Sequence, residues 1–367
     1  MSSFAVTVET ITVSAHPDPE VVRLEVARVG QMGYEAVVPK GAFVSGQLVG
    51  YIPESAVLAD PQFVDALGLT GLLAGKDRNR VKPKRLRGVL SQGIVFDLET
   101  ARPWLGGGFD PDAAHAAGVD LACCLPVVKW VPVVPASMSG QVEPAPELIR
   151  WIDIESRFRF PDVFRPGERV HVSEKVHSSC LLVTTDVATG ELWVSSKGFG
   201  GKNLALVEDD RNVYWRAVRA HRLDEAAAAV AEATGAVRVG LFGEVYGAGV
   251  QDLGYGRARG DYGYACFDGY IVDATGSGRW LEQAELRELL PGWVATVPCL
   301  YEGLFDEAAI LALADGSESV SGTAAHIREG VVVRAVPERR SDLLGGRAIV
   351  KYVSADYLTR QGGTEYE

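Results

Sequence analysis

Apolar and polar positions alternate through the first third of the chain in the manner of short β-strands. Apolar side chains recur at every second position, and Gly or Pro breaks separate the runs. The strands expected from this pattern are residues 5–11, 22–26, 35–39, 47–52 and 91–98, with one helix near 61–69. Short strands joined by tight turns predict a small β-barrel over residues 1–130.

The alternation stops between residues 131 and 150. Four prolines, at positions 132, 135, 144 and 146, accompany a Ser-Met-Ser-Gly stretch there, and this composition is typical of an inter-domain linker. Downstream, the pattern mixes strand and helix periods. Strands are expected at 169–172, 181–185, 192–195, 237–245, 264–272, 330–336 and 347–353, and helices at 223–234, 280–290 and 306–314. This succession predicts an α+β domain over 151–367, with antiparallel sheets and flanking helices.

The composition agrees with two folded domains. The chain has 367 residues, of which 47% are hydrophobic and 23% charged, enough apolar content for a core in each domain. The five cysteines form no Cys-x-x-Cys pair, so we expect reduced thiols in a cytoplasmic protein. No secretory leader is evident, and no apolar run approaches roughly 18 residues, so we expect no membrane span.

Several familiar motifs fail on inspection. In the segment 254–260 the third glycine comes one place too late for a dinucleotide-binding fingerprint, and 198–203 lacks two of the residues that define a P-loop. The six histidines show no metal-ligand spacing. A structural or solvent-facing role is the favoured interpretation for His171 and His177, which flank an expected turn.

Five segments of the second domain carry reactive or charged side chains within or at the ends of expected strands. They are 172–179 (VSEKVHSS), 242–247 (FGEVYG), 264–268 (YACFD), 329–334 (EGVVVR) and 347–354 (RAIVKYVS). Each one alone has an ordinary structural explanation. In this order, however, they resemble the motif succession of the covalent nucleotidyltransferases, the superfamily of polynucleotide ligases and mRNA capping enzymes.

Further stretches narrow the resemblance. Residues 14–18 (SAHPD), 33–40 (GYEAVVPK), 85–93 (RLRGVLSQG) and 160–164 (FPDVF) are similar to the Deinococcus-type RNA ligases. That family has an N-terminal oligonucleotide-binding (OB) barrel ahead of the nucleotidyltransferase domain. The resemblance therefore implies an OB domain at 1–130, a linker at 131–150 and an adenylyltransferase domain at 151–367.

The resemblance implies catalysis through Lys175. In the family, a lysine attacks ATP to form lysyl-AMP, the AMP passes to a 5′-phosphate end, and a 3′-hydroxyl then displaces it. Because an unperturbed lysine is almost wholly protonated at pH 7, a divalent metal and a second lysine, Lys351, are expected to disfavour its ammonium form. Lys351 is also expected to contact the α-phosphate, and Glu329 to hold Mg²⁺ or Mn²⁺.

The resemblance assigns the nucleotide further contacts. Glu244 is expected at the ribose or the metal, Phe267 on the adenine face and Glu174 at the adenine amino group. Two positions depart from the family pattern: Ser178 stands where the nucleophile motif has glycine, and Lys197 where the next strand has arginine. Lysine keeps the charge at this nucleotide-contacting position but loses the bidentate fork.

The net charge of −12 is unevenly distributed, because residues 76–87 are strongly basic. This stretch has seven basic residues and one acidic residue, a net +6, so the rest of the chain carries −18. A basic stretch on the expected barrel predicts polynucleotide binding through Lys82, Lys84, Arg85 and Arg87, although a solvated loop would have the same composition.

Three functions stay open on the sequence alone. The first is an ATP-dependent RNA ligase that seals 3′-hydroxyl, 5′-phosphate breaks, with nicked duplex as its partner and an undetermined oligomeric state. The second is a clamp that binds nucleic-acid ends without sealing them, which the changes at positions 178 and 197 favour. The third is a GTP-using, capping-type enzyme, against which the domain order speaks.

Overall fold

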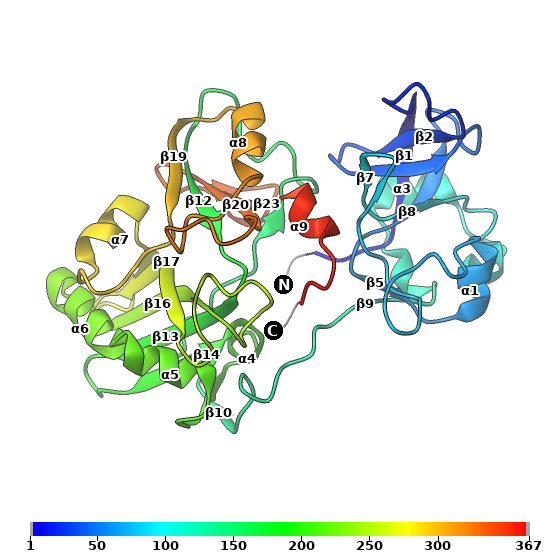
Figure 1. Ribbon diagram of the computed structural model, residues 1–367. Coiled ribbons are helices and arrows are strands. Elements are labelled where there is room, and N and C mark those ends of the chain that lie inside the picture. The colour runs from blue at the N-terminus through cyan, green and yellow to red at the C-terminus, as the bar shows by residue number, and fades with distance from the viewer. Residues whose placement is uncertain (1–2, 365–367) are drawn as a thin grey trace. The chain divides into compact units, whose positions relative to one another are not determined.

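The structure, a computed structural model, describes residues 3–364 and divides them into two compact units. The N-terminal unit holds the residues up to Val131 together with Glu155–Asp162. The C-terminal unit holds Pro132–Ile154 and the chain from Val163 onward. The α+β prediction is confirmed as a mixed fold of sheets and helices (Figure 1).

A five-stranded antiparallel sheet organises the N-terminal unit. Its strand order is β3-β2-β1-β4-β8, and β3 also contacts β8, so the sheet curls into a nearly closed, barrel-like form. The strands are β1 (Thr7–Ala15), β2 (Leu24–Val29), β3 (Glu35–Pro39), β4 (Leu48–Ile52) and β8 (Ile94–Phe96). Val8, Ile52, Phe63 and Phe96 fill its core together with residues of the surrounding helices.

Shorter elements surround this sheet. They are β5 (Ala56–Leu58), α1 (Pro61–Ala66), β6 (Lys84–Leu86), β7 (Val89–Ser91), α2 (Arg102–Leu105), α3 (Pro111–Ala117), the 3₁₀ helix η1 (Leu121–Cys123), β9 (Val127–Lys129) and β11 (Glu155–Ser156). Strands β6 and β7 form a hairpin whose turn residues, Arg87 and Gly88, both have positive φ. Such a turn suits the right-handed twist of a two-stranded ribbon.

Two antiparallel sheets form the C-terminal unit. One contains β23-β20-β12-β19 in that order, and the other has the order β14-β13-β16-β17-β18. The strands are β12 (Arg169–Lys175), β13 (Ser179–Asp186), β14 (Leu192–Ser196), β16 (Arg238–Tyr246), β17 (Gly263–Val272), β18 (Gly278–Trp280), β19 (Cys299–Leu304), β20 (Gly330–Ala335) and β23 (Ile349–Val353). The short strands are β10 (Val142–Pro144), β15 (Leu204–Leu206), β21 (Arg340–Ser341) and β22 (Gly346–Arg347). The helices are α4 (Lys197–Gly200), α5 (Val213–Ala220), α6 (Leu223–Thr234), α7 (Gln283–Leu289), α8 (Glu307–Ala314) and α9 (Ala355–Thr359).

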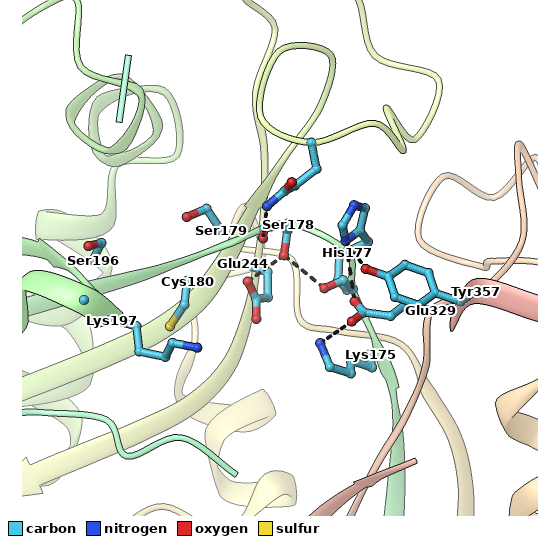
Figure 2. Close-up of a pocket in the computed structure, with 13 residues that line it drawn as sticks. Lys175, His177, Ser178, Ser179, Cys180, Ser196, Lys197, Glu244, Glu329 and Tyr357 are labelled. Carbon is cyan, nitrogen blue, oxygen red and sulfur yellow. Dashed lines mark hydrogen bonds and ion pairs between the residues drawn. The ribbon is translucent and has the colours of Figure 1, made fainter. Parts of the chain in front are cut away.

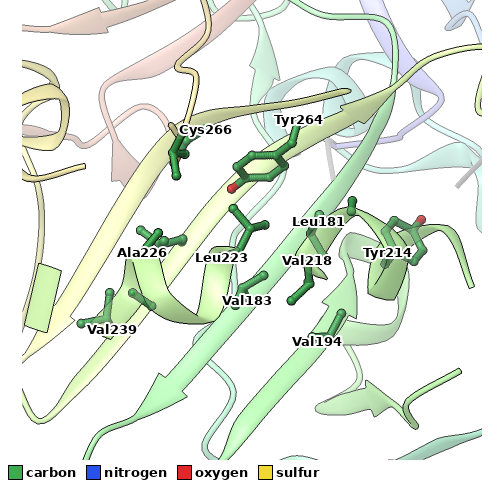
Figure 3. Close-up of a cluster of buried hydrophobic side chains, with 14 of the residues drawn as sticks. Leu181, Val183, Val194, Tyr214, Val218, Leu223, Ala226, Val239, Tyr264 and Cys266 are labelled. Atoms are coloured by element: carbon green, nitrogen blue, oxygen red, sulfur yellow. The ribbon is translucent and has the colours of Figure 1, made fainter. Parts of the chain in front are cut away.

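The second sheet is buried on both faces, which explains its nearly continuous apolar strands. On β13, Leu181 and Val183 pack under α5 and α6 (Figure 3). Leu182 belongs to the apolar cluster on the opposite face of the sheet. Helix α6 buries Leu223, Ala226, Ala227, Val230 and Ala231, the i, i+3, i+4 spacing of one helical face. Its observed bounds agree with the expected 223–234.

The boundary between the units differs from the sequence prediction in two places. The expected linker 131–150 packs into the C-terminal unit, where Met138 and Leu148 are buried and β10 pairs with β15. The prolines make this backbone irregular, but the apolar side chains beside them still pack against the C-terminal unit. Conversely, Glu155–Asp162 belongs to the N-terminal unit, because the amide of Gly33 donates to the carbonyl of Phe158 (2.7 Å).

Helix α5 was missed because its sequence, Val-Tyr-Trp-Arg-Ala-Val-Arg-Ala, is rich in strand-forming residues. The side chain of Asn212 accepts hydrogen bonds from the amides of Tyr214 and Trp215 and so starts the helix. All five cysteines are free thiols, as expected. Across residues 3–364, no helix has the length and apolar character that a membrane crossing requires.

Truncation of Leu181 tests the helix-covered core. The side chain is fully buried, so Leu181→Ala should lower the free energy of unfolding by about 2–5 kcal/mol. Val187→Ala is the control, because Val187 follows the same strand but is 50% exposed. Denaturant unfolding measures both variants, and equal stabilities would contradict this description of the core.

Candidate active site

Lys175 is the last residue of β12 and lies between two cavities of the C-terminal unit. The first, the polar cavity, has a volume of about 180 Å³ and contains Lys175, His177, Ser178, Ser196, Lys197, Glu244, Gln251, Glu329 and Tyr357 in its wall. The second, the aromatic cavity, has a volume of about 120 Å³ and contains Trp151, Asp153, Glu174, Lys175, Lys197, Glu244, Phe267, Val332 and Lys351. The structure thus brings together all the residues that the sequence assigned to nucleotide and metal.

An ion pair fixes the lysine. The Nζ atom of Lys175 lies 2.7 Å from Oε1 of Glu329, and the two side chains are 22% and 9% exposed (Figure 2). Burial by itself would lower the pKa of Lys175, but the carboxylates of Glu329 and Glu244 raise it above the ordinary value. The amine is therefore held as an ammonium, and a nucleophilic Lys175 requires that these two carboxylates be neutralised.

Glu244 belongs to β16 and faces the same lysine. Burial raises the pKa of Glu244 to about 7, and the neighbouring Glu329 adds to the effect, against the opposing influence of Lys175 and Ser178. The hydroxyl of Ser178 donates a hydrogen bond to Glu244 Oε2 at 2.5 Å. The serine that replaces the family's glycine thus holds this carboxylate in place, and its backbone keeps a negative φ.

Two further lysines extend the positive charge across the aromatic cavity. Lys351 on β23 and Lys197 at the start of α4 lie 3.9 and 3.6 Å from opposite oxygens of Asp153. Burial lowers the pKa of Lys351; Asp153 opposes that shift, and Lys175 and Lys197 reinforce it. Asp153 was missed, because it lies three residues after the expected linker and no recognisable motif surrounds it.

A β-bulge places the aromatic wall. In the pairing of β16 with β17, Phe242 faces Asp268 and Gly243 faces Cys266, so Phe267 is the extra residue. The bulge turns Phe267 and Asp268 to the same side of the sheet, where strand alternation alone would separate them. Phe267 meets the ring of Trp151 edge-on, with ring centroids 4.9 Å apart.

Asp268 holds the aromatic wall in place through a hydrogen bond to Trp151. One oxygen accepts from Trp151 Nε1 at 3.1 Å, and the guanidinium groups of Arg334 and Arg347 bind both oxygens. Burial raises the pKa of Asp268, but the two arginines outweigh it and hold the pKa below the usual value. Trp151, which the sequence reading missed, is thereby fixed against Phe267.

Glu174, the residue before the lysine, has one oxygen engaged and one free. Its Oε2 accepts from the amide of Ser319 (2.9 Å) and lies 3.5 Å from Arg328 Nε, whereas Oε1 is buried and has no hydrogen-bond partner within residues 3–364. Burial raises the pKa of Glu174, against the hydrogen bonds from Ser319. The free oxygen is an unsatisfied acceptor in a residue that lines the aromatic cavity.

Gly330 explains why a glycine follows Glu329. Its φ is +156°, and a Cβ atom here would overlap the carbonyl oxygen of Tyr352 on the adjacent strand. Only glycine permits this close approach of β20 to β23, which places Glu329 beside Lys175.

The solvent-facing alternative for His171 and His177 is wrong. Both are buried, and His171 lies within β12 instead of beside a turn. His171 is also the one histidine that, within residues 3–364, joins a group with metal-ligand distances, together with Cys299 and Glu302. Arg287 donates to its Nε2 atom (3.1 Å), so a guanidinium already occupies that histidine nitrogen.

The residues expected to bind nucleic acid all lie in the N-terminal unit. Lys84, Arg85 and Arg87 are exposed on the β6–β7 hairpin, whereas Lys82 is half-buried. Lys84 donates to the carbonyl of Leu72. The hairpin thus carries three exposed basic side chains, of the kind that contacts phosphate groups in protein–nucleic acid complexes.

The fold is similar to that of a known RNA ligase. Three solved structures of the Naegleria gruberi RNA ligase superimpose on this chain, each with a TM-score of 0.74. The structure with pyrophosphate is 21% identical in sequence, and the match covers 97% of this chain and 98% of that one. A lysine variant with ATP and manganese and a glutamate variant with AMP and manganese are both 22% identical; these matches cover 96% and 97% of this chain, respectively, and 98% of each ligase chain. An aspartate variant of the same ligase carries its substitution two positions after that of the lysine variant. None of the curated proteins matches the sequence.

These matches define the fold as that of a ligase-type nucleotidyltransferase. The RNA ligase family model matches residues 168–353, half of the chain, and includes Lys175, Glu244, Glu329 and Lys351. The chain belongs to the RNA ligase family.

Glu244→Gln should change how stability depends on pH. Ionisation of Glu244 is disfavoured in the folded chain, so its contribution is fully present below its usual pKa of 4.5 and is lost as the pH rises through about 7, by up to about 3 kcal/mol. The glutamine variant does not ionise, so its Tm relative to wild type should increase between pH 4.5 and 7 and then level off. Glu191→Gln, at an exposed site, is the control. If the Tm of wild type and the Tm of Glu244→Gln changed in parallel with pH, the raised pKa of Glu244 would be contradicted.

Proposed function

We propose that this protein is an ATP-dependent RNA ligase that seals 3′-hydroxyl, 5′-phosphate breaks, with nicks in duplexes as its substrates. The observation that carries the proposal is the position of Lys175, at the end of β12 between the two cavities and beside Glu329 and Glu244, in a chain of the RNA ligase family. A half-buried lysine surrounded by carboxylates and further lysines suits a nucleophile that attacks a phosphorus atom.

The aromatic cavity is the proposed adenosine site. Phe267 offers a ring face for stacking, Trp151 supports it edge-on, and the free Oε1 of Glu174 would accept a hydrogen bond from the adenine amino group. An amino group at this position separates ATP from GTP, which speaks against the capping-type alternative. The Naegleria gruberi ligase, with the same fold, has been solved with ATP and with AMP.

Glu244 and Glu329 are the proposed holders of a divalent cation. They are hard oxygen donors, and the negative charges of both act on the amine of Lys175. When bound, the ion would neutralise the two carboxylates and polarise phosphate oxygens. Mn²⁺ accompanies the nucleotide in the Naegleria gruberi structures, and Mg²⁺ would fit the same donors.

The chain's own residues account for the three steps. The Nζ lone pair of Lys175 attacks the α-phosphorus of ATP, pyrophosphate leaves, and the amine loses its proton to give lysyl-AMP. An oxygen of the RNA 5′-phosphate then displaces the lysine to give an adenylated end, and the 3′-hydroxyl displaces AMP. Lys351 and Lys197 would stabilise the charge that develops on the α-phosphate.

The N-terminal unit is the proposed polynucleotide clamp. Its strand order, β3-β2-β1-β4-β8 with β3 near β8, is compatible with an OB barrel, and the β6–β7 hairpin adds exposed basic residues. An N-terminal barrel before a ligase domain is the layout of the Deinococcus-type RNA ligases, and we assign the chain to that type.

Lys175→Ala should abolish AMP uptake. The purified protein is incubated with α-labelled ATP and Mg²⁺ or Mn²⁺, and protein-bound label is measured after denaturation. We expect label on wild type and on Lys202→Ala, an exposed lysine control, and none on Lys175→Ala. A wild type that takes up no AMP with either metal would reduce the protein to a nucleic-acid-binding module, and equal labelling of Lys175→Ala would remove that lysine from its role.

Charge reversal on the hairpin should separate binding from chemistry. We expect Arg85→Glu combined with Arg87→Glu to weaken binding to a nicked duplex roughly tenfold or more at low salt and to flatten its salt dependence, because fewer counterions are released. AMP uptake by Lys175 should survive. Arg211→Glu with Arg340→Glu, two exposed positions of the C-terminal unit, is the charge-matched control, and unchanged nick affinity in the hairpin variant would refute the clamp assignment.

A further inference from the structure

His177 lies two residues after the nucleophile, and its side chain is buried in the wall of the polar cavity. The same spacing separates the lysine and the aspartate that were substituted in the Naegleria gruberi structures. Histidine offers two nitrogens on opposite edges of one ring, so it can connect two partners that a shorter carboxylate would not reach together. In this structure, the two nitrogens of the His177 ring contact different segments of the chain.

The ring of His177 is held on both edges. Its Nε2 atom lies 2.7 Å from Oδ1 of Asp252. On the other edge, its Nδ1 atom lies 2.7 Å from the hydroxyl of Tyr357 (Figure 2). Its backbone amide donates to the hydroxyl of Tyr255 at 2.6 Å. The two ring contacts set the orientation of the imidazole, and the contact with Tyr255 fixes the backbone that carries it.

The Nδ1 edge of His177 faces Glu329. The distance from Nδ1 to Oε2 of Glu329 is 3.9 Å, while the other oxygen of Glu329 pairs with Lys175. The carboxylate therefore lies between the nucleophile and the histidine. Any movement of the ring changes the space available to the group that pairs with Lys175.

The last described residues of the chain hold Asp252 and thereby the ring. Arg360 donates to both oxygens of Asp252 (3.1 and 3.2 Å) and stacks on Tyr357, and the amide of Thr364 donates to Oδ1 at 2.8 Å. Burial alone would raise the pKa of Asp252, but these hydrogen bonds and the one from His177 hold it well below its usual value.

The same segment also holds Glu329 through the backbone. The amide of Ser354 donates to the carbonyl of Glu329 at 2.8 Å, and the Ser354 hydroxyl donates to the carbonyl of Arg328 at 3.1 Å. Ser354 caps α9, which presents Tyr357 to His177. The segment 354–364, which we name the C-terminal clasp, lies beyond the family match that ends at residue 353.

We propose that Tyr357 and Arg360 of the C-terminal clasp belong to the active site and that His177 is the positioning residue through which they act. The clasp fixes His177 by Tyr357 and by Arg360 through Asp252, and His177 in turn sets the side chain of Glu329 beside Lys175. The proposal rests on the proposed function, because its effect is measured on lysyl-AMP formation. Supporting groups of this kind typically change metal affinity or activity by 10–100-fold when they are removed.

Tyr357→Phe is the central variant, because it removes one hydroxyl and keeps the ring under Arg360. Thr359→Val is its matched control: it also removes one hydroxyl from α9, and that hydroxyl donates to the carbonyl of Ala355 within the helix. Lysyl-AMP formation is measured with α-labelled ATP over a range of Mn²⁺ concentrations. We expect Tyr357→Phe to need about tenfold more Mn²⁺ for half-maximal rate, and Thr359→Val to match wild type.

Two His177 variants show which edge of the ring matters. Asparagine places an amide near the Nδ1 position, and glutamine places one near Nε2. We expect His177→Asn to retain more activity than His177→Gln, because only the former has a polar group facing Tyr357 and Glu329. Adding Tyr357→Phe to His177→Ala should cause no further loss, since the tyrosine acts through the histidine.

The outcomes separate the two proposals. Absence of AMP uptake by wild type contradicts the ligase function itself. Normal uptake with the same Mn²⁺ dependence in wild type, Thr359→Val and Tyr357→Phe overturns the clasp. If Tyr357→Phe also lowers Tm, the rate at which this variant seals a pre-adenylated nick at saturating Mn²⁺ is compared with the wild-type rate. A general loss of folded protein lowers sealing and lysyl-AMP formation alike. An equal loss in both steps would therefore also overturn the role of the clasp.

Discussion

The ion pair between Lys175 and Glu329 is the interaction on which the rest of the site depends. It brings a cation out of water at the end of β12, and such a charge is tolerated only with partners and hydrogen bonds around it. Glu244, Lys351, Lys197 and Asp153 supply the alternating charges that extend from this pair. The same compensation keeps the lysine protonated, so the stable resting arrangement is an unreactive one. Nucleotide and cation can then act by changing this balance instead of by moving the backbone.

The two sheets of the C-terminal unit make that arrangement possible. Lys175 ends β12, Glu329 directly precedes β20, and Lys351 lies on β23. These three strands pair in register, so the relative positions of the side chains follow from backbone hydrogen bonds. Glu244 and Phe267 come from the other sheet. The helix-covered face of that sheet is a close-packed apolar layer (Figure 3), which keeps the opposite face, with Glu244 and Phe267, from shifting. Rigidity on one side of a sheet thus supports chemistry on the other.

The sequence predicted Lys175, Glu244, Phe267, Glu329 and Lys351 because each lies in a short motif and the motifs follow one another in a fixed order. It could not predict Trp151 or Asp153, whose partners Asp268 and Lys351 are more than a hundred residues away and leave no local pattern. Barrel strands and helix α6 followed from periodicity. The linker did not, because proline content indicates an irregular backbone and says nothing about whether the apolar residues beside it are buried. His177 was misjudged for the same reason: Tyr357 and Asp252 become its neighbours only in the folded chain.

The bulge in β17 has a consequence for how this site can vary. Because one extra residue turns Phe267 and Asp268 to the same side, the aromatic ring of the cavity wall and the carboxylate that anchors this wall depend on the number of residues in the strand as much as on their identities. Substitutions along β17 leave this count unchanged and can adjust the fit of the base gradually. Loss of a single residue at the bulge would instead restore plain alternation and send either the ring or the carboxylate into the helix-covered core. This strand can therefore diverge in composition but hardly in length.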